Sequence, residues 1–406
     1  MIQEQFQVSG AYKKWTFGLL AVGALALILG FIVYGTSKDD HAVTRFWAVL
    51  MQNSLFFLMI CNSSMFFICA TTLAHGGWQT AFRRVPEAIS AAVPVFSILA
   101  LLIFIGIVAG NHHHIYEWLD KEAVSKDPIL NFKKGFLNPT FFFVWTLVTL
   151  GTWSFVGWKM RQLSRKSDEP MSHAEGTKFL WTNSIWAAIF IVFFALTVAS
   201  TIPWLWLMSI DAHWFSTMYS WYTFASTFVS GICLITLFVI YLKNQDRLEF
   251  VNEEHLHDLG KFMFAFSIFW TYLWFSQFML IWYANIPEET IYFKPRMQGP
   301  YRGLFFLNLI VNFVAPILIL MKRSSKRNYA TLTFMSVLLI LGHWIDFYQM
   351  VMPGTIGNDY SLGWFEFGIL ALYAGLLMYF VGRALVKAPL VPKYHPYLKE
   401  SIIHHT

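Results

Sequence analysis

Ten long apolar runs constrain this sequence more than any other feature. About 20 apolar residues in a helix cross the hydrocarbon of a bilayer, and each run is close to or above that length. Apolar residues make up 57% of the 406 and charged residues 13%, about half the charged share of soluble domains. The sequence therefore predicts an all-α integral membrane protein with ten transmembrane helices and excludes a water-soluble fold. The predicted spans have their cores at Trp15–Tyr34, Phe46–Thr72, Ala91–Val108, Phe141–Met160, Phe179–Met208, Thr217–Tyr241, Leu259–Tyr283, Leu304–Leu320, Leu332–Met350 and Trp364–Leu385.

Weak internal symmetry divides these spans into two groups. Spans three and seven both contain Phe-Ser-Ile, and spans four and eight both lead into basic, serine-rich loops, a pattern compatible with two four-span halves. The first run is too long for the apolar core of a signal peptide and lacks a small-residue cleavage site, so we expect an uncleaved span. The predicted segments are a tail and first span (1–44), a first four-helix bundle (45–212), a second four-helix bundle (213–352), and the last span with a tail (353–406).

The 29 lysines and arginines predict the orientation of the chain. Twenty of them fall in the terminal segments and the even-numbered loops, and nine fall in the odd-numbered loops. Cytoplasmic loops carry the positive excess, so both termini should be cytoplasmic, as in a multi-pass protein of a bacterial inner membrane. The net charge of +6 follows from this bias and does not call for a nucleic-acid partner.

The connection from Gly110 to Thr140 is the longest between spans. It contains an amphipathic segment at Ile115–Phe132 that we expect to lie on the outer face, against lipid headgroups or a partner. Asn138 and Pro139 suit the cap and first turn of the fourth span.

Cysteine and histidine usage limits the redox centres that this chain can hold. The three cysteines lie in apolar runs and cannot form a cysteine-ligated cluster or a disulfide framework. Of the thirteen histidines only His343 lies deep in a predicted span, whereas a membrane b haem needs two facing histidines. We therefore expect no metal and no redox cofactor in this chain. The run at 112–114 is interpreted as a surface feature, because three consecutive side chains do not easily converge on one ion.

Span nine carries the clearest candidate site. His343 lies about 11 residues, or roughly 17 Å of helix, beyond Leu332, near the middle of the bilayer. Asp346 follows three residues later on the same helix face. Ionisable groups within spans are costly, and a coupled carboxylate and imidazole can relay protons or accept them from a quinol. The alternative is a polar pair that only holds helices together, the role we favour for Gln52 and Asn53 in span two.

A second candidate pair, Asp211 and His213, lies in the tight turn between spans five and six. The pair would serve as a proton exit or as a contact for a quinol headgroup. The alternative is equally weighted: Asp211 caps span six and His213 is solvated, because charge is inexpensive at an interface.

Weaker candidates precede and enter span seven. The acidic and histidine residues at 253–258 could collect protons. Acidic residues at a helix start also interact favourably with the helix dipole, and this structural role is the one we favour. The proton path would use Asp258, Tyr272, Ser276 and Gln277.

Three segments resemble one known family when taken together. They are Leu207–Trp221 (LMSIDAHWFSTMYSW), His257–Thr290 (HDLGKFMFAFSIFWTYLWFSQFMLIWYANIPEET) and His343–Gly354 (HWIDFYQMVMPG), the last preceded by the basic loop Met321–Asn328. They are similar to the F subunits of bacterial alternative complex III, within the NrfD-like superfamily of polysulfide-reductase membrane subunits. The MS-x-D-x-HWFST pattern is shared with the sister C subunits, while WYANIPEE at Trp282–Glu289 favours F.

The resemblance implies two four-helix bundles flanked by the first and last spans and a place in a quinol:electron-acceptor oxidoreductase of the respiratory chain. It implies a quinol or menaquinol substrate for the complex and no redox cofactor in this chain. It also implies partners that carry c-type haems and iron–sulfur clusters: multihaem and monohaem cytochrome c subunits, an iron–sulfur subunit, a homologous membrane subunit and, in some complexes, a terminal oxidase. The site residues carried over are His343, Asp346, Asp211 and His213.

Three functions are therefore compared for this chain. The leading hypothesis is a proton-handling subunit that is not catalytic alone. A second is a structural scaffold that docks peripheral redox subunits. A third is a solute transporter, which ranks last because the interior prolines Pro94, Pro203 and Pro316 form no matched pair in the two halves.

Overall fold

The structure is a computed structural model that describes residues 6–359 and 362–405. This part of the chain is all-helical, with 80% of residues in helices. Within it, ten helical segments are long and apolar enough to cross a membrane, and each coincides with one predicted span, which confirms the number of spans. They are Gly10–Gly35, Asp40–Leu73, Arg84–Ala109, Pro139–Asp168, His173–Trp206, Met218–Lys243, Glu253–Ala284, Arg302–Leu320, Tyr329–Thr355 and Trp364–Val386.

Several of these segments combine an α-helix with a π-helical or 3₁₀ turn. The spanning helices are α1 (Gly10–Gly30), α2 (Asp40–Leu73), α3 (Arg84–Ser90), α4 (Val93–Ala109), α7 (Pro139–Ser164), α8 (His173–Leu196), α9 (Ile202–Trp206), α10 (Met218–Lys243), α11 (Glu253–Ala284), α14 (Arg302–Leu309), α15 (Ala315–Leu320), α16 (Tyr329–Thr355) and α17 (Trp364–Val386). The short helices outside them are α5 (Lys121–Lys126), α6 (Pro128–Lys133), α12 (Pro287–Thr290), α13 (Phe293–Gln298) and α18 (Leu398–Ile402). The predicted terminal segments also include 1–5, 360–361 and 406, which lie outside the described residues.

Local sequence signals account for several helix ends. Asn138 caps α7 by accepting a hydrogen bond from the Phe141 amide, and Pro139 occupies the first turn, as predicted. Glu253 and Glu254 lie in the first turn of α11, where negative charge favours the helix dipole. The same helix ends at Asn285, whose φ of 49° is a left-handed conformation that asparagine tolerates.

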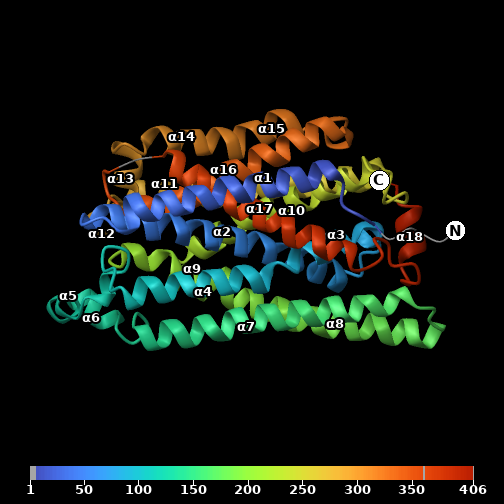
Figure 1. The fold of residues 1–406 in the computed structure, drawn as a ribbon, viewed down its shortest axis with the longest axis horizontal. Coiled ribbons are helices and arrows are strands. Elements are labelled where there is room, and N and C mark those ends of the chain that lie inside the picture. The colour runs from blue at the N-terminus through green and yellow to red at the C-terminus, as the bar shows by residue number, and fades with distance from the viewer. Residues whose placement is uncertain (1–5, 360–361, 406) are drawn as a thin grey trace.

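The spanning helices run side by side, and both termini lie at the same end of the molecule (Figure 1). We call this end the termini side, and it also holds α3 and α18 (Figure 1). The other end, the opposite side, holds the short helices α5, α6, α12 and α13 (Figure 1). An even number of spans places the two ends of the chain on one side, in agreement with the predicted topology.

Two helices form the centre of the fold. The apolar windows of α2 and α10 are 83% and 89% buried, compared with 22% for α1. α2 packs against α4, α8, α10 and α16, and α10 packs also against α11 and α16. Large apolar side chains on the outer helices face outward, including Leu25, Val192 and Leu318, as expected for lipid-contacting surfaces.

The long connection on the opposite side differs from the single amphipathic segment predicted at Ile115–Phe132. A 3₁₀ turn is followed by two separate six-residue helices, α5 and α6. The chain divides because Asp120 and Asp127 each have extended backbone and accept amide hydrogen bonds from the helix that follows. Aspartate side chains therefore start new helices within the amphipathic pattern.

Candidate functional site

Asp346 is the centre of a buried polar cluster between four helices. Its side chain on α16 is fully buried and accepts hydrogen bonds from a different helix at each of three contacts. The Tyr222 hydroxyl on α10 and the Asn308 amide on α14 donate to Oδ1, the latter at 2.7 Å. The Trp270 indole on α11 donates to Oδ2 at 3.0 Å. The carboxylate thus links α16 to α10, α11 and α14.

His343 lies one turn away on the same face of α16, as predicted, and is also fully buried. Its Nδ1 is 3.0 Å from the Ser226 hydroxyl oxygen and 3.9 Å from Asp346 Oδ2. Its Nε2 has no hydrogen-bond partner among the described residues. Because one imidazole nitrogen faces the carboxylate and the other is unpaired, the ring can hold or release a proton without breaking a hydrogen bond at Nε2.

A π-helical turn in the eighth span supports this cluster. The turn covers Ile310–Val314 and contains Asn312, whose amide donates to Asn308 Oδ1 at 2.5 Å. On the facing helix, a Cβ added to Gly342 would lie 2.2 Å from Asn312 Oδ1. Glycine at position 342 therefore allows α16 to approach the π turn, and the two asparagines continue the hydrogen-bonded chain to Asp346. Such turns are frequent at functional sites.

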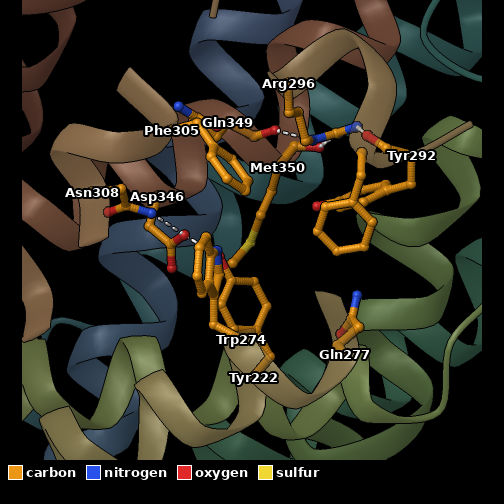
Figure 2. Close-up of a pocket in the computed structure, with 11 residues that line it drawn as sticks. Tyr222, Trp274, Gln277, Tyr292, Arg296, Phe305, Asn308, Asp346, Gln349 and Met350 are labelled. Carbon is orange, nitrogen blue, oxygen red and sulfur yellow. Dashed lines mark hydrogen bonds between the residues drawn. The ribbon is translucent and has the colours of Figure 1, made fainter. Parts of the chain in front are cut away.

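A small cavity extends from Asp346 toward the opposite side of the membrane domain. Its volume is about 20 Å³, enough for about one water molecule. Asp346 and Asn308 lie on one side of it, and Arg296 and Tyr292 lie across from them, with Gln277 below (Figure 2). The remaining lining residues are Tyr222, Trp274, Phe293, Phe305, Gln349 and Met350.

Arg296, on the short helix α13, is a buried cation at the far edge of this cavity. Its guanidinium donates to the carbonyls of Tyr292 at 2.5 Å, Gln349 at 2.9 Å and Met350 at 3.3 Å, and to Asp211 Oδ2 at 3.3 Å. It also stacks over the Tyr292 ring, 3.5 Å from the centroid. Burial disfavours its charged form, but Tyr292 and Asp211 outweigh this and raise its pKa. Burial also raises the pKa of Tyr292 to about 12, so that phenol stays neutral at physiological pH.

Asp211 and His213 occupy different surroundings. Asp211 pairs with Arg296 and does not cap span six, because α10 begins after Thr217 without a side-chain cap. The alternative that Asp211 caps span six is therefore wrong. The short 3₁₀ turn that ends at Asp211 keeps this residue away from the start of α10. His213 binds Asp127 at 2.5 Å and lies 3.5 Å from Glu117. This hydrogen bond lowers the pKa of Asp127, and it ties the turn to the 110–138 connection.

The weaker candidates on α11 are not brought together. Asp258 lies at the termini side, where it contacts Lys261 at 2.5 Å and His404 at 2.8 Å. Tyr272 is 63% exposed on the outer surface of the fold, and the Ser276 hydroxyl donates to a carbonyl of its own helix. Gln277 alone of this group lines the cavity, and its Oε1 has no hydrogen-bond partner among the described residues.

Sequence reasoning missed most of the partners of Asp346. Tyr222 and Trp270 are two of 76 aromatic residues, and nothing in their local sequence marks them as partners of Asp346. Asn308 and Asn312 do have a signal, because two asparagines four residues apart in an apolar run indicate interhelical hydrogen bonding. Arg296 was counted as an ordinary loop cation, but it is 2% exposed.

The arrangement can store and transfer a proton. A buried carboxylate is costly without a partner, and three donors reduce that cost without neutralising the charge. The adjacent imidazole and the cavity provide a second proton site and room for a water. Among residues 6–359 and 362–405, no group of three or more histidine, cysteine or acidic side chains could hold a metal ion.

No protein-family model matches this chain, and no curated protein matches it significantly.

Proposed function

We propose that this chain is an integral membrane subunit of a quinol:electron-acceptor oxidoreductase of the alternative complex III type, in which it binds and passes on protons released during quinol oxidation. The observation that carries the proposal is the buried Asp346 carboxylate, with three donors and His343 beside it, at the edge of a cavity that leads to Arg296. Intramembrane ionisable groups of this kind usually have a function in ion or proton transfer.

The proposed proton path runs from His343 and Asp346 through the cavity to Arg296 and Asp211. Gln277 supports this path because its unpaired Oε1 lies at the same cavity and can bind a water. The path ends at the ion pair of Asp211 with Arg296, where the buried cation disfavours an excess proton that stays in the cavity. If the termini are cytoplasmic, as the positive-inside rule predicts, protons leave on the outer side.

The proposed architecture is two four-helix bundles flanked by the first and last spans. α2 packs against α4 and α8, and α7 packs against both α4 and α8, which supports a first bundle. α10 packs against α11 and α16, α15 packs against α11, and α14 packs against α16, which supports a second. Asp346 would then lie inside the second bundle, where helices on every side can supply donors.

The proposed setting is a bacterial inner membrane with both termini cytoplasmic. The chain would be catalytic only within the complex and would hold no redox cofactor of its own. Electrons would pass through c-type haems and iron–sulfur clusters in partner subunits, beside a homologous membrane subunit. Purification of the native complex in mild detergent, with mass spectrometry and a reduced-minus-oxidised spectrum, tests this setting. A chain that purifies alone and colourless would contradict it.

Asp346→Asn tests the proton function. Asparagine keeps the size of the side chain but cannot carry a proton, so quinol-driven proton release should fall at least tenfold while the complex still assembles. Asp246→Asn is the matched control, because Asp246 is exposed in a turn at φ 52°, a conformation that asparagine tolerates. Normal proton release in the Asp346 variant would exclude the relay.

A structural scaffold is the second candidate function. It is favoured by the same three hydrogen bonds, because a carboxylate shared between four helices also fixes their packing. Normal turnover and proton stoichiometry after replacing both His343 and Asp346, in a complex that retains all its subunits, would favour the scaffold.

A further inference from the structure

A second, larger cavity lies at the termini side and shares no lining residue with the cavity beside Asp346. Its volume is about 340 Å³, within the range of small-molecule sites. It lies between α3, α7 and the end of α17 with the segment that follows it. Five of its lining residues are cationic, and one is acidic; they are Arg84, Arg161, Arg165, Arg383, Lys387 and Glu87.

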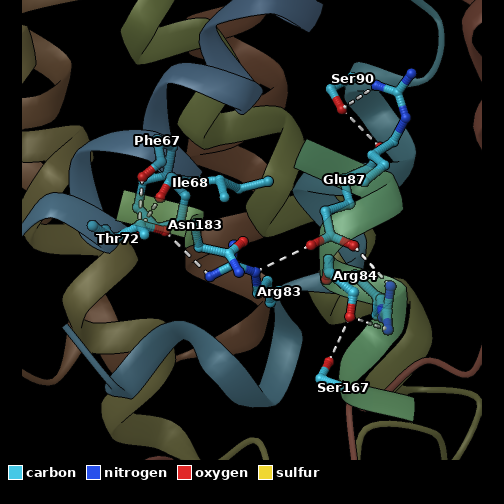
Figure 3. Close-up of polar contacts among 12 residues, drawn as sticks. Phe67, Ile68, Thr72, Arg83, Arg84, Glu87, Ser90, Ser167 and Asn183 are labelled. Carbon is cyan, nitrogen blue, oxygen red and sulfur yellow. Dashed lines mark hydrogen bonds and ion pairs between the residues drawn. The ribbon is translucent and has the colours of Figure 1, made fainter. Parts of the chain in front are cut away.

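The lining carboxylate Glu87 and the neighbouring Asp168 already have arginine partners. Glu87 binds Arg83 and Arg84, each at 3.1 Å, and lies between them (Figure 3). Asp168 binds Arg84 at 2.6 Å. Glu87 and both arginines are buried, and Asp168 is partly buried, so the two carboxylates are held in place. Arg84 Nε still has no hydrogen-bond partner among the described residues.

The other four cations have no carboxylate partner within the described part of the chain. Arg161 donates to the Ser90 hydroxyl at 3.1 Å, and Arg383 donates to the Tyr379 hydroxyl at 3.3 Å. Arg165 and Lys387 are exposed at the rim of the cavity. Hydroxyl groups do not neutralise charge, so the five cations that line the cavity face one lining carboxylate, and four positive charges are in excess.

The rest of the wall is apolar and aromatic. Trp158 on α7 is 50% exposed, and Phe380, Ala88 and Leu385 are among the other lining residues. Tryptophan beside basic residues at the end of a spanning helix is typical of the level of lipid headgroups. A ligand that fits this cavity therefore has an anionic head and an apolar body that continues along the helices.

We propose that this cavity binds the phosphate headgroup of an anionic phospholipid. Basic pockets between helices on the cytoplasmic side recognise such headgroups. The phosphate of the lipid would neutralise the positive charge that has no carboxylate partner in the protein. Cardiolipin is the expected best ligand, because its two phosphates bring two negative charges to the four cations that have no carboxylate partner. Inorganic phosphate shares the head chemistry but lacks the acyl chains that Trp158 and Phe380 would contact. The site is independent of the proton function proposed for Asp346.

The test uses the full chain or its native complex, delipidated in mild detergent and analysed by native mass spectrometry with added cardiolipin, phosphatidylcholine or inorganic phosphate. Arg161→Gln/Arg383→Gln should weaken cardiolipin binding roughly 10- to 30-fold, since each basic residue near a membrane surface contributes about fivefold. Lys178→Gln/Lys322→Gln is the control, with two exposed cations outside the cavity, and it should change binding less than about twofold.

Three results would overturn the proposal. They are equal binding of cardiolipin and phosphatidylcholine by the unmodified protein, undiminished cardiolipin binding by the double variant, and competition by inorganic phosphate at the same concentration as the lipid. The last would show a free-phosphate site in place of a lipid site. If the double variant fails to purify, Lys387→Gln tests the same site through an exposed side chain and should weaken cardiolipin binding about fivefold. Undiminished binding by this variant would overturn the proposal equally.

Discussion

Gly342→Ala tests the packing that supports the Asp346 cluster. The new Cβ would lie 2.2 Å from Asn312 Oδ1 and 2.5 Å from Val311 Cγ1. One side must therefore move by about 1 Å to reach ordinary van der Waals contact. The asparagine can rotate away, but it then loses its 2.5 Å hydrogen bond to Asn308, which orients the amide that donates to Asp346.

The expected magnitude follows from opposing terms. Overpacking costs about 1–3 kcal/mol, and loss of the hydrogen bond costs about 1 kcal/mol. Alanine is favoured over glycine in a helix by about 1 kcal/mol, which offsets part of this cost. We expect Gly342→Ala to lower the free energy of unfolding by about 1–3 kcal/mol. A reversible denaturation titration in mixed micelles measures it.

Gly151→Ala is the matched control. Gly151 is also a helical glycine, in α7, but a Cβ added there meets nothing within 4 Å. This control should be neutral or more stable by up to about 1 kcal/mol. Asn312→Ala combined with Gly342→Ala should cost less than the sum of the two single changes, because the smaller side chain leaves room for the new methyl. A Gly342→Ala protein as stable as the Gly151→Ala protein would refute the close approach of α16 to the π turn.

Two further predictions concern the edges of the fold. Arg45→Ala should lower the free energy of unfolding by about 3–5 kcal/mol, because Glu366 is 1% exposed and would lose hydrogen bonds of 2.8 and 2.9 Å. Adding Glu366→Gln should recover part of the loss in the same titration, and no loss in the single variant would contradict the argument. Burial, with Arg83 and Arg84 nearby, lowers the pKa of His395 well below its usual value. The unfolded state therefore gains a proton first as pH falls, so stability is lost below about pH 6.5, by about 1.4 kcal/mol per pH unit at most. After correction for the intrinsic exchange rate, the protection of α18 against hydrogen exchange should fall as pH is lowered from about 7.5 to about 5.5, and His395→Gln should abolish this fall. Unchanged protection over this range would contradict the argument.

The spans could be predicted because their signals are local. A run of apolar residues long enough to cross a bilayer has few alternatives to a helix, since every backbone polar group must be satisfied within the segment. The cap at Asn138 followed from its own neighbours for the same reason. The helices at 121–133 were not separated, because the aspartates that divide them look like ordinary surface residues of one amphipathic pattern.

The site could be predicted only where a single residue is costly by itself. His343 and Asp346 stand out because an ionisable group inside a span is energetically costly and is therefore a candidate for function. Their partners come from helices up to 124 residues away, such as Tyr222, and only the tertiary fold brings them together. The polar pair in span two was easier to interpret: Gln52 donates to the Trp344 carbonyl and Asn53 accepts from its indole, which confirms interhelical hydrogen bonding there.

The hydrogen bonds of Asp346 also connect its charge to the positions of three helices. Tyr222, Trp270 and Asn308 all donate, and this arrangement suits an ionised carboxylate that only accepts. When Asp346 takes up a proton, one oxygen becomes a donor, and the Tyr222 hydroxyl can turn to accept from it, while the Trp270 indole can only donate. Asn308 adjoins a π turn whose backbone hydrogen bonds differ from those of the surrounding helix, so this partner can also shift. A shift of Asn308 on protonation would change the packing of span eight against α16, the same contact that Gly342 keeps close.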